Sequence, residues 1–208
     1  MDARIATYFG GGEVALDVGC GNGGAFDDVA ARYATTLGLD IFPPCATSSP
    51  ERPGWTFMLA DLNRGIPVGD GRADAVHANQ VIEHVANPLH FAQEAYRVLR
   101  PGGVFVVTTP NIQYLPHLWN LVVRGRGPIT SEERCCTATN WDDGHIHFLT
   151  TTDLAWVARR SGFRRLQTRA LVAPTGRLAP LRQRLDRWSA SEIVKRYLSG
   201  VAMLVATK

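Results

Sequence analysis

Residues 17–24 read Asp-Val-Gly-Cys-Gly-Asn-Gly-Gly, and they end a short apolar run, Val14 to Val18, that predicts a β-strand. Helical periodicity begins directly after them, and we expect a helix over residues 25–33. Glycines at a strand-to-helix turn let a ligand approach the backbone closely. The stretch therefore predicts a ligand-binding loop in the first βα unit of an α/β fold.

The loop matches two ligand-binding fingerprints. Gly19, Gly21 and Gly24 fit G-x-G-x-x-G, which binds dinucleotides. Asp17 and Gly23, with the first two of these glycines, fit the acidic-x-G-x-G-x-G pattern that binds S-adenosylmethionine. A dinucleotide brings an anionic pyrophosphate, whereas S-adenosylmethionine carries a sulfonium and an ammonium. The carboxylate of Asp17 at the mouth of the loop favours the cationic ligand.

The rest of the chain alternates short apolar runs with helical periodicity, which is typical of a parallel sheet covered by helices. We expect further strands at residues 35–39, 55–59, 73–78, 104–108, 163–172 and 201–206. We expect further helices at residues 88–99, after the capping cluster 150–153 with a stop at Gly162, and at residues 178–197. The pattern predicts one domain over residues 1–208.

Several later motifs add to the glycine loop. Asp40 ends the second expected strand, Asp61 follows the third, and residues 82–85 (Ile-Glu-His-Val) and 96–103 (Tyr-Arg-Val-Leu-Arg-Pro-Gly-Gly) come after them. In this order, over residues 14–110, the motifs resemble the class I S-adenosylmethionine-dependent methyltransferases. The resemblance implies a Rossmann-like, doubly wound sheet of seven mostly parallel strands, with the last strand antiparallel.

The resemblance also implies a cofactor site for S-adenosylmethionine. Asp40 would accept hydrogen bonds from both ribose hydroxyls, and Asp61 would face the adenine amino group. We expect the cofactor-binding residues to be Asp17, Gly19, Gly21, Gly23, Asp40, Ile41, Asp61, Leu62 and Asn79.

A second group of candidate functional residues lies in residues 110–150. The helical and strand periodicity lapses there, and we expect a substrate-binding insertion after the fifth strand. His145 and His147 would share one face of an extended segment there. In methyltransferases that look similar, a His-x-His-Phe segment approaches the acceptor, so we expect His145 as general base, oriented by His147 or Asp143. The alternative is that one histidine satisfies backbone groups and the other is exposed.

Glu83 and His84 follow the fourth expected strand, where open α/β sheets bind ligands. The pair resembles the metal-binding stretch of ubiquinone-pathway O-methyltransferases, in which a further Glu stands three residues earlier. Gln80 occupies that position here, although Asp142 or Asp143 could supply the missing oxygen for Mg²⁺. The pair therefore either shapes the catalytic floor, holds a metal ion or packs against the cofactor.

The function these features favour is methyl transfer to a hydroxyl of a small molecule. A saccharide acceptor suits the insertion, because it mixes aromatic and hydrogen-bonding residues: Tyr114, His117, Trp119, Asn120, Asn140, Trp141, Asp142 and Asp143. The length and the double-histidine loop also resemble the sugar 1-O-methyltransferases of methylmannose polysaccharide synthesis. The alternatives are a quinone or polyketide O-methyltransferase, a noncatalytic S-adenosylmethionine-binding subunit, and a nucleotide-binding oxidoreductase.

The composition limits the classes of binding partner that we expect for this chain. A net charge of +3 over 208 residues does not indicate a nucleic-acid-binding protein, and we expect the arginine-rich residues 159–187 to form a solvated face or a subunit contact. No apolar run approaches the ~18 residues that span a bilayer, so we expect a cytoplasmic protein without membrane contact. The four cysteines have neither disulfide nor zinc-site spacing. Residues 1–12 are too short for a lid, so we expect a homodimer that closes the site.

Overall fold

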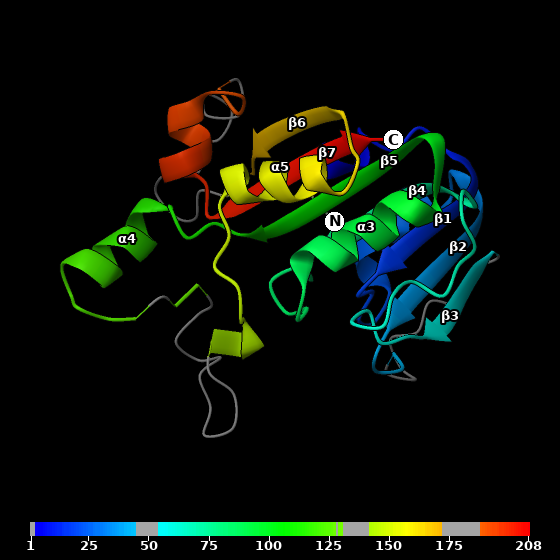
Figure 1. The fold of residues 1–208 in the computed structure, drawn as a ribbon, viewed down its shortest axis with the longest axis horizontal. Helices are drawn as coiled ribbons and strands as arrows, with labels where there is room; N and C mark the ends of the chain where they lie inside the picture. The colour runs from blue at the N-terminus through cyan, green and yellow to red at the C-terminus, as the bar shows by residue number, and fades with distance from the viewer. Residues whose placement is uncertain (1–2, 45–53, 128, 131–141, 172–187) are drawn as a thin grey trace.

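The chain is described by a computed structural model that covers residues 3–44, 54–127, 129–130, 142–171 and 188–208. One seven-stranded sheet in the order β3-β2-β1-β4-β5-β7-β6 runs through it (Figure 1). The strands are β1 (Gly12–Val18), β2 (Tyr33–Asp40), β3 (Trp55–Leu59), β4 (Ala73–Asn79), β5 (Leu99–Pro110), β6 (Arg165–Ala170) and β7 (Val201–Thr207). The helical segments are α1 (Ala3–Ala6), η1 (Gly24–Phe26), α2 (Asp27–Ala30), α3 (Pro88–Val98), α4 (Leu115–Val122), η3 (Asp142–Gly144), α5 (Thr151–Arg160) and η5 (Val194–Leu198).

The direction of the strands confirms the predicted fold. β1 to β5 pair in parallel, while β7 pairs antiparallel with both β5 and β6. The order of the strands reverses between β1 and β4, because the chain builds outward to β3 before it returns to β4. Ligands of open α/β sheets bind outside the carboxyl ends of the strands at such a reversal. A ligand is therefore expected to bind beside the segments that follow β1 and β4.

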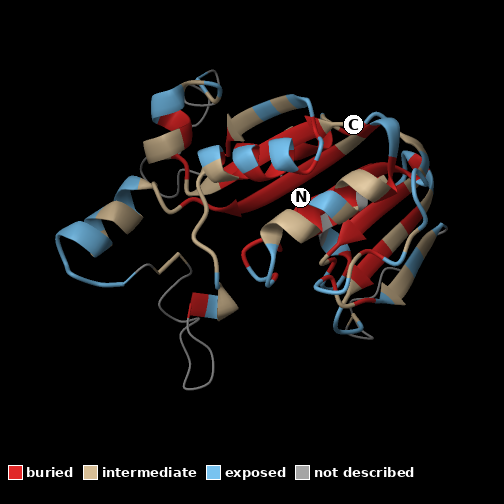
Figure 2. Ribbon diagram, viewed as in Figure 1, coloured by how far each residue is buried: buried red, intermediate tan, exposed pale blue. Residues whose placement is uncertain are grey.

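Each face of the sheet buries its own core, and the central strands are mostly buried, whereas the edge strands β3 and β6 are mostly not (Figure 2). Neighbouring residues of β5 illustrate this, since Phe105 and Val107 pack on one face and Val106 packs on the other. Helices α3 and α5 cover the first face, whereas α1, η1 and α2 cover the second. Burial on both faces explains the continuous apolar runs of the sequence.

The caps of the two long helices follow from the sequence. The Asn87 side chain accepts a hydrogen bond from the His90 amide at the start of α3. Thr150 and Asp153 form a reciprocal capping box at the start of α5, as the cluster at residues 150–153 predicts.

The helix predicted over residues 25–33 is wrong in its second half. Helix α2 ends at Ala30, and Tyr33 begins β2 instead. Tyr33 is buried against Phe26, and its backbone is paired in register with Gly12 of β1. Pairing with the neighbouring strand and burial of the ring therefore outweigh the local helical periodicity.

Other boundaries also differ from the predicted ones. β5 begins at Leu99 rather than at residue 104, and β6 covers only Arg165–Ala170 of the expected 163–172. The expected insertion contains helix α4, which was not predicted although Leu115, Leu118, Trp119 and Val122 recur at helical spacing. Residues 178–187 of the last expected helix lie outside the described residues, and the described part ends in the short π-helix η5.

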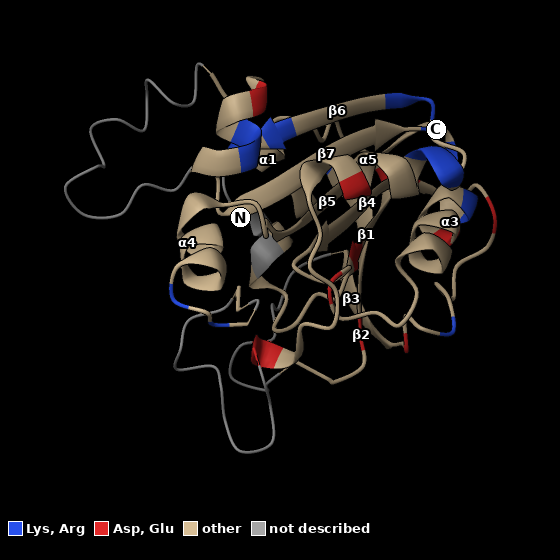
Figure 3. Cartoon of the chain, turned by 60° about the vertical axis from the view of Figure 1, so that its left-hand side comes forward, with Lys and Arg blue, Asp and Glu red and all other residues tan. Residues whose placement is uncertain are grey.

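Basic residues lie on β6 and at the ends of α3 and α5 (Figure 3). Arg165 pairs in register with Thr207 of β7, which in turn pairs with Val104 near the start of the parallel region of β5. This end of the arginine-rich stretch therefore lies at the amino edge of the parallel strands. Among the described residues, no helix is long and apolar enough to cross a bilayer.

Cys20 is the described cysteine, and it is buried and free in the glycine loop. Burial raises the pKa of its thiol to about 12, and the charges of Asp17 and Asp40 contribute to that rise. The thiol therefore stays protonated at neutral pH and serves as packing. Cys45, Cys135 and Cys136 lie outside the described residues.

Candidate active site

A pocket of about 340 Å³ opens at the carboxyl ends of the strands, where the strand order reverses. Its size lies at the lower end of the range for small-molecule sites. The lining residues are Gly19, Asp40, Ile41, Ala60, Asp61, Leu62, Asn63, Gln80, Val81, His84 and Val85. Five of the expected cofactor residues are among them: Gly19, Asp40, Ile41, Asp61 and Leu62.

The glycine loop is held against the end of β2. The amides of Gly19 and Cys20 both donate to the Leu39 carbonyl, and the Gly21 amide donates to Asp40 Oδ2 at 2.8 Å. Gly19 has φ +70°, and a Cβ there would lie 2.3 Å from a methyl carbon of Val81. Only glycine tolerates both the left-handed backbone and the close approach of Val81. The loop thus leaves a space, here called the cradle, that a side chain at Gly19 would fill.

Gly19→Ala should destabilise the fold and weaken cofactor binding, because it adds a left-handed alanine and a clash with Val81. The backbone conformation alone costs about 1–2 kcal/mol. Gly24→Ala is the matched control, since a Cβ added at Gly24 would have no neighbour within 4 Å. Thermal unfolding and calorimetric titration with S-adenosylhomocysteine measure the two effects. Equal behaviour of the two variants would show that the cradle is not a tight one.

The two acidic residues of the pocket are partly committed to backbone groups. Asp40 also accepts from the Phe42 amide at 3.1 Å, and Asp61 accepts from the amide of Asn63. Asn63 in turn accepts from the Ala86 amide at 2.7 Å, which ties the segment after β3 to the segment after β4. Asn63 was not among the residues expected from the sequence, although an Asp two residues before an Asn is a turn signal.

Gln80, Val81 and Val85 are other lining residues that the sequence did not assign to the cofactor site. Gln80 has φ +57°, and its amide and side chain both donate to Thr108 Oγ1. This left-handed residue follows β4 and turns the chain along the pocket wall. The sequence carries no turn signal there, because the conformation comes from contact with β5.

Four expected cofactor residues do not line the pocket: Asp17, Gly21, Gly23 and Asn79. Asn79 is exposed and accepts from Thr108 Oγ1. Asp17 is buried and lies 2.7 Å from Nδ1 of His77, its register partner on β4. The His77 ring stacks on Phe26, so this pair faces the core that η1 covers. Asp17 can thus act on a ligand in this pocket through its charge but not by contact.

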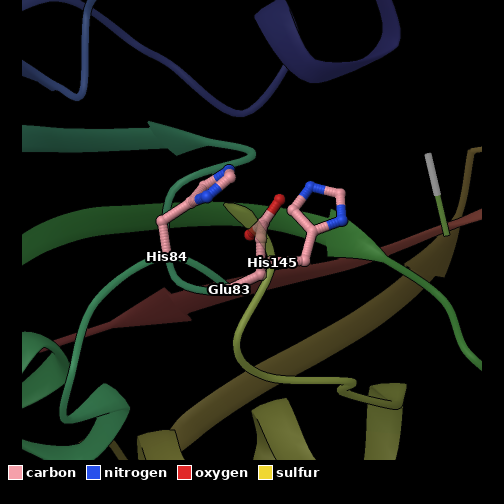
Figure 4. A group of neighbouring side chains, drawn as sticks. All are labelled: Glu83, His84 and His145. Carbon is pink, nitrogen blue, oxygen red and sulfur yellow. The ribbon is translucent and has the colours of Figure 1, made fainter. Parts of the chain in front are cut away.

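Glu83, His84 and His145 form a cluster beside the pocket, with one donor atom of each within 4.8 Å of the others. Figure 4 shows the Glu83 carboxylate pointing to the same side as the two imidazole rings, whose centroids are 4.8 Å apart. His84 belongs to both the pocket wall and the cluster. The cluster is therefore placed to act on a molecule that enters the pocket.

Backbone pairing brings the double-histidine segment to Glu83. The amides of Ile146 and His147 both donate to the Glu83 carbonyl, at 3.0 and 3.1 Å. The turn before them is tight, since Asp142 and Asp143 have φ of +49° and +56°.

In each imidazole of the cluster, Nδ1 makes a hydrogen bond on the side facing away from the other cluster residues. Nδ1 of His84 lies 3.1 Å from the Gly144 carbonyl, which can only accept, so this ring carries its proton there. Nδ1 of His145 lies 2.9 Å from Thr130 Oγ1 and 3.4 Å from Asp142 Oδ2. Asp142 is fully buried and also accepts from the Thr130 amide. Nε2 of both rings is thus the nitrogen left to face a ligand.

His147 and Asp143 do not join the cluster. His147 Nε2 is buried without a hydrogen-bond partner among the described residues, and Asp143 is exposed. Asp142, rather than either of these, stands behind His145. The expected orienting residue is therefore replaced by its neighbour, because the tight turn points Asp142 inward.

Glu83 is fully buried, and neither of its carboxylate oxygens has a hydrogen-bond partner among the described residues. Burial raises the pKa of Glu83 to about 7. Its own backbone and the nearby Thr109 hydroxyl offset only part of that rise, and the Thr109 hydroxyl does not meet hydrogen-bond geometry with the carboxylate. Burial also lowers the pKa of His84, and the charge of His145 lowers it further. Without a metal ion, burial therefore disfavours both the ionised form of Glu83 and the protonated form of His84.

In metal-free buffer Glu83→Gln should be more stable than the wild type at pH 8. The folded pKa of Glu83 lies above its unfolded value of 4.5, so ionisation costs stability as the pH rises from about 4.5 to about 7. Above that window the cost is about 3 kcal/mol, a rough conversion of the shift. Urea unfolding of both proteins at pH 5 and pH 8 checks this. A stability difference that does not grow with pH would contradict it.

Comparisons with known proteins identify the family of the chain. A family model described as a methyltransferase domain matches residues 3–168. A probable S-adenosylmethionine-dependent methyltransferase of Mycolicibacterium smegmatis is 37% identical over 112 residues, which are 52% of this chain and 42% of the relative. A ubiquinone biosynthesis O-methyltransferase of Cereibacter sphaeroides is 32% identical over 100 residues, 46% of this chain and 40% of the relative. The chain thus matches less than half the length of these curated relatives.

The fold also has solved counterparts. An S-adenosylmethionine-dependent methyltransferase from Archaeoglobus fulgidus superposes with a TM-score of 0.69 at 16% identity, covering 99% of this chain and 90% of that one. A phosphoethanolamine N-methyltransferase 2 of Haemonchus contortus, solved in complex with S-adenosylmethionine, gives a TM-score of 0.63 at 16% identity and covers 99% and 51%. Likeness at this identity concerns the fold alone. Because the family model spans most of this chain, the chain belongs to the methyltransferase-domain family. It has the fold of the class I S-adenosylmethionine-dependent methyltransferases.

Proposed function

We propose that the protein transfers a methyl group from S-adenosylmethionine to a hydroxyl oxygen of a small molecule. One observation carries the proposal: the pocket built from the glycine loop and the acidic strand ends shares the side chain of His84 with the Glu83–His84–His145 cluster. Donor binding and proton removal would thus occur at adjoining places, as methyl transfer to oxygen requires.

The cofactor would be held by the residues that line the pocket. Asp40 and Asp61 keep acceptor capacity beyond their backbone bonds, so Asp40 suits the ribose hydroxyls and Asp61 the adenine amino group. Ile41 and Leu62 lie beside them and offer apolar surface to the base. Gly19 leaves the space that the cradle needs.

S-adenosylmethionine supplies the methyl group on a sulfonium, so the acceptor oxygen forms the new C–O bond while the C–S electron pair stays on sulfur. The protein must orient the acceptor and remove the hydroxyl proton. We place proton removal at the cluster, where Nε2 of His145 is the nitrogen left free of its backing hydrogen bonds. The role of His145 as general base stays a prediction.

The acceptor is proposed to be a saccharide, because aromatic and polar side chains occur together on α4 and at its start. The Tyr114 and His117 rings are in contact, with centroids 5.3 Å apart, and Trp119 is 57% exposed. Backbone contacts join this region to the segment that follows the cluster, since the Ile112 amide donates to the Leu149 carbonyl. Asn140 and Trp141, which the sequence also proposes for the acceptor, lie outside the described residues.

The second candidate acceptor is a phenolic hydroxyl of a quinone precursor or of a polyketide. The relatives named ubiquinone biosynthesis O-methyltransferases favour it, and the exposed apolar side chains of α4 suit a ring or an alkyl chain as well as a sugar. The homodimer and the cytoplasmic location stay predictions.

A screen with methyl-labelled donor over sugars, phenols and hydroquinones tests the proposed function. We expect label in an alkali-stable ether of one of these classes. Transfer only to amines or carboxylates would overturn the hydroxyl assignment. Binding of S-adenosylhomocysteine without transfer to any compound would favour a noncatalytic binding subunit, and binding of NAD instead would favour an oxidoreductase.

A further inference from the structure

The cluster beside the pocket has the composition of a transition-metal site. It brings together two imidazoles and one carboxylate, with one donor atom from each residue within 4.8 Å of the others. Ligands bound at about 2.1 Å in tetrahedral geometry stand about 3.4 Å apart, so the donors would need to close by roughly 1.4 Å at most. Small rotations of three side chains accomplish a movement of that size.

The groups behind the imidazoles are those that orient metal-bound histidines. A ligating histidine usually donates its other ring N–H to a carboxylate or a backbone carbonyl, which fixes the tautomer and the ring orientation. His84 does so with the Gly144 carbonyl, and His145 faces both the Asp142 carboxylate and the Thr130 hydroxyl. Thr130 Oγ1 itself donates to Asp142, so it can accept from the imidazole. The Nε2 lone pair of each ring is thereby left for a ligand.

The buried carboxylate is an independent observation. Glu83 is fully buried, and both of its side-chain oxygens lack a hydrogen-bond partner among the described residues. A buried charged group without a partner is costly, and such groups are usually paired or coordinate a metal. Figure 4 shows the carboxylate pointing to the same side as the two rings rather than away from them. Within the described part of the chain, the arrangement therefore lacks a positive partner at the point where the three donors converge.

We propose that Glu83, His84 and His145 together bind one divalent transition-metal ion, with Zn²⁺ preferred to Mg²⁺. Imidazole donors suit Zn²⁺ and its neighbours, whereas Mg²⁺ prefers oxygen ligands and near-ideal octahedral geometry. Asp142 and Asp143 do not supply the additional oxygen that Mg²⁺ would need, because Asp142 lies behind His145 and Asp143 is exposed.

A catalytic role for this metal ion rests on the proposed function, methyl transfer to a hydroxyl. Two histidines and one glutamate leave a coordination position open in catalytic zinc sites. The ion would supply Lewis-acid polarisation of the acceptor hydroxyl, whose proton then leaves to solvent water. His145 would act as a ligand in that case, since its Nε2 lone pair cannot hold a metal ion and a proton together.

Calorimetric titration of EDTA-stripped, desalted protein with ZnCl₂ and with MgCl₂ tests the proposal. We expect one Zn²⁺ per chain, bound at least a hundredfold more tightly than Mg²⁺. Glu83→Gln and His145→Ala should each weaken Zn²⁺ binding about a hundredfold or more, since loss of an outer hydrogen-bond partner alone costs 10–100-fold. Asp142→Asn should cost about tenfold. His90→Ala, which removes an imidazole on α3 outside the cluster, is the control and should bind Zn²⁺ like the wild type.

A Co²⁺ spectrum identifies the donors, because the chain also has four cysteines. Visible d–d bands without a near-ultraviolet thiolate band, lost in Glu83→Gln, are the expected result. Unchanged Zn²⁺ affinity in Glu83→Gln, a thiolate band, or Mg²⁺ bound as tightly as Zn²⁺ would overturn the proposal. Glu83→Gln keeps the shape of the side chain, so it carries the test if the alanine variant does not fold.

Separate readouts distinguish this inference from the proposed function. Methyl transfer to a hydroxyl by EDTA-stripped protein that binds no Zn²⁺ would overturn the metal site and leave the proposed function standing. Tight Zn²⁺ binding at the cluster, with no transfer to any hydroxyl compound, would support the site and count against the proposed function.

Discussion

Replacing His145 with alanine should lower the rate of methyl transfer to a hydroxyl about a hundredfold or more, a size typical of losing a general base. The affinity for S-adenosylhomocysteine should change little, because His145 does not line the cofactor pocket. Steady-state kinetics with labelled donor and calorimetric titration measure the two quantities. The loss is expected whether His145 removes the proton itself or holds a metal ion.

His147→Ala and chelation are the controls for His145. His147 stands two residues away and lies outside the cluster, so its replacement should cost less. If EDTA abolishes turnover and Zn²⁺ restores it, His145 acts as a ligand. If turnover of the wild type persists in metal-free buffer and is lost in His145→Ala, His145 acts as a base. Near-normal turnover of His145→Ala across the pH range would remove it from either role.

Asp40→Ala should weaken the binding of S-adenosylhomocysteine at least about a hundredfold and leave the protein folded. Two hydrogen bonds from ribose hydroxyls to a carboxylate are charge-assisted, and each such bond contributes about 1.5–3 kcal/mol. The variant also frees the Gly21 amide that Asp40 holds at 2.8 Å. Calorimetric titration measures the affinity, and thermal unfolding checks the fold.

Asp40→Asn separates the two contributions of Asp40. Asparagine keeps one oxygen for the Gly21 amide but loses the charge, so we expect an affinity between those of the wild type and the alanine variant. An unchanged dissociation constant in Asp40→Ala would show that the ribose is held elsewhere.

The fold was predictable because its signals are local and repeated. The glycine loop after β1, the acidic residues at and after the ends of β2 and β3, and the capping box of α5 each reflect chemistry within a few residues of sequence. Tyr33 shows where this fails, since its strand conformation depends on pairing with Gly12 and burial against Phe26. Helix α4 was not predicted for a different reason, because it has only eight residues, which are too few for helical periodicity to identify a helix.

The site could be predicted in its parts but not in its orientation. Topology indicates that segments after β4 and within the insertion lie near the carboxyl edge, and the structure places His145 beside Glu83 and His84. The sequence does not show that Asp17 turns toward His77 and away from the pocket, because a shift of one position reverses the face of a strand residue. Nor does it show that Asp142, rather than Asp143, supports His145, since this depends on two left-handed residues in the turn.

A crystal structure of the complex with S-adenosylhomocysteine tests most directly the claim that the pocket and the cluster form one active site. We expect the ribose hydroxyls on Asp40, the adenine beside Asp61 and Leu62, and the sulfur directed toward the cluster of Glu83, His84 and His145. S-adenosylhomocysteine bound outside this pocket, or bound in it with the sulfur turned away from the cluster, would contradict the account.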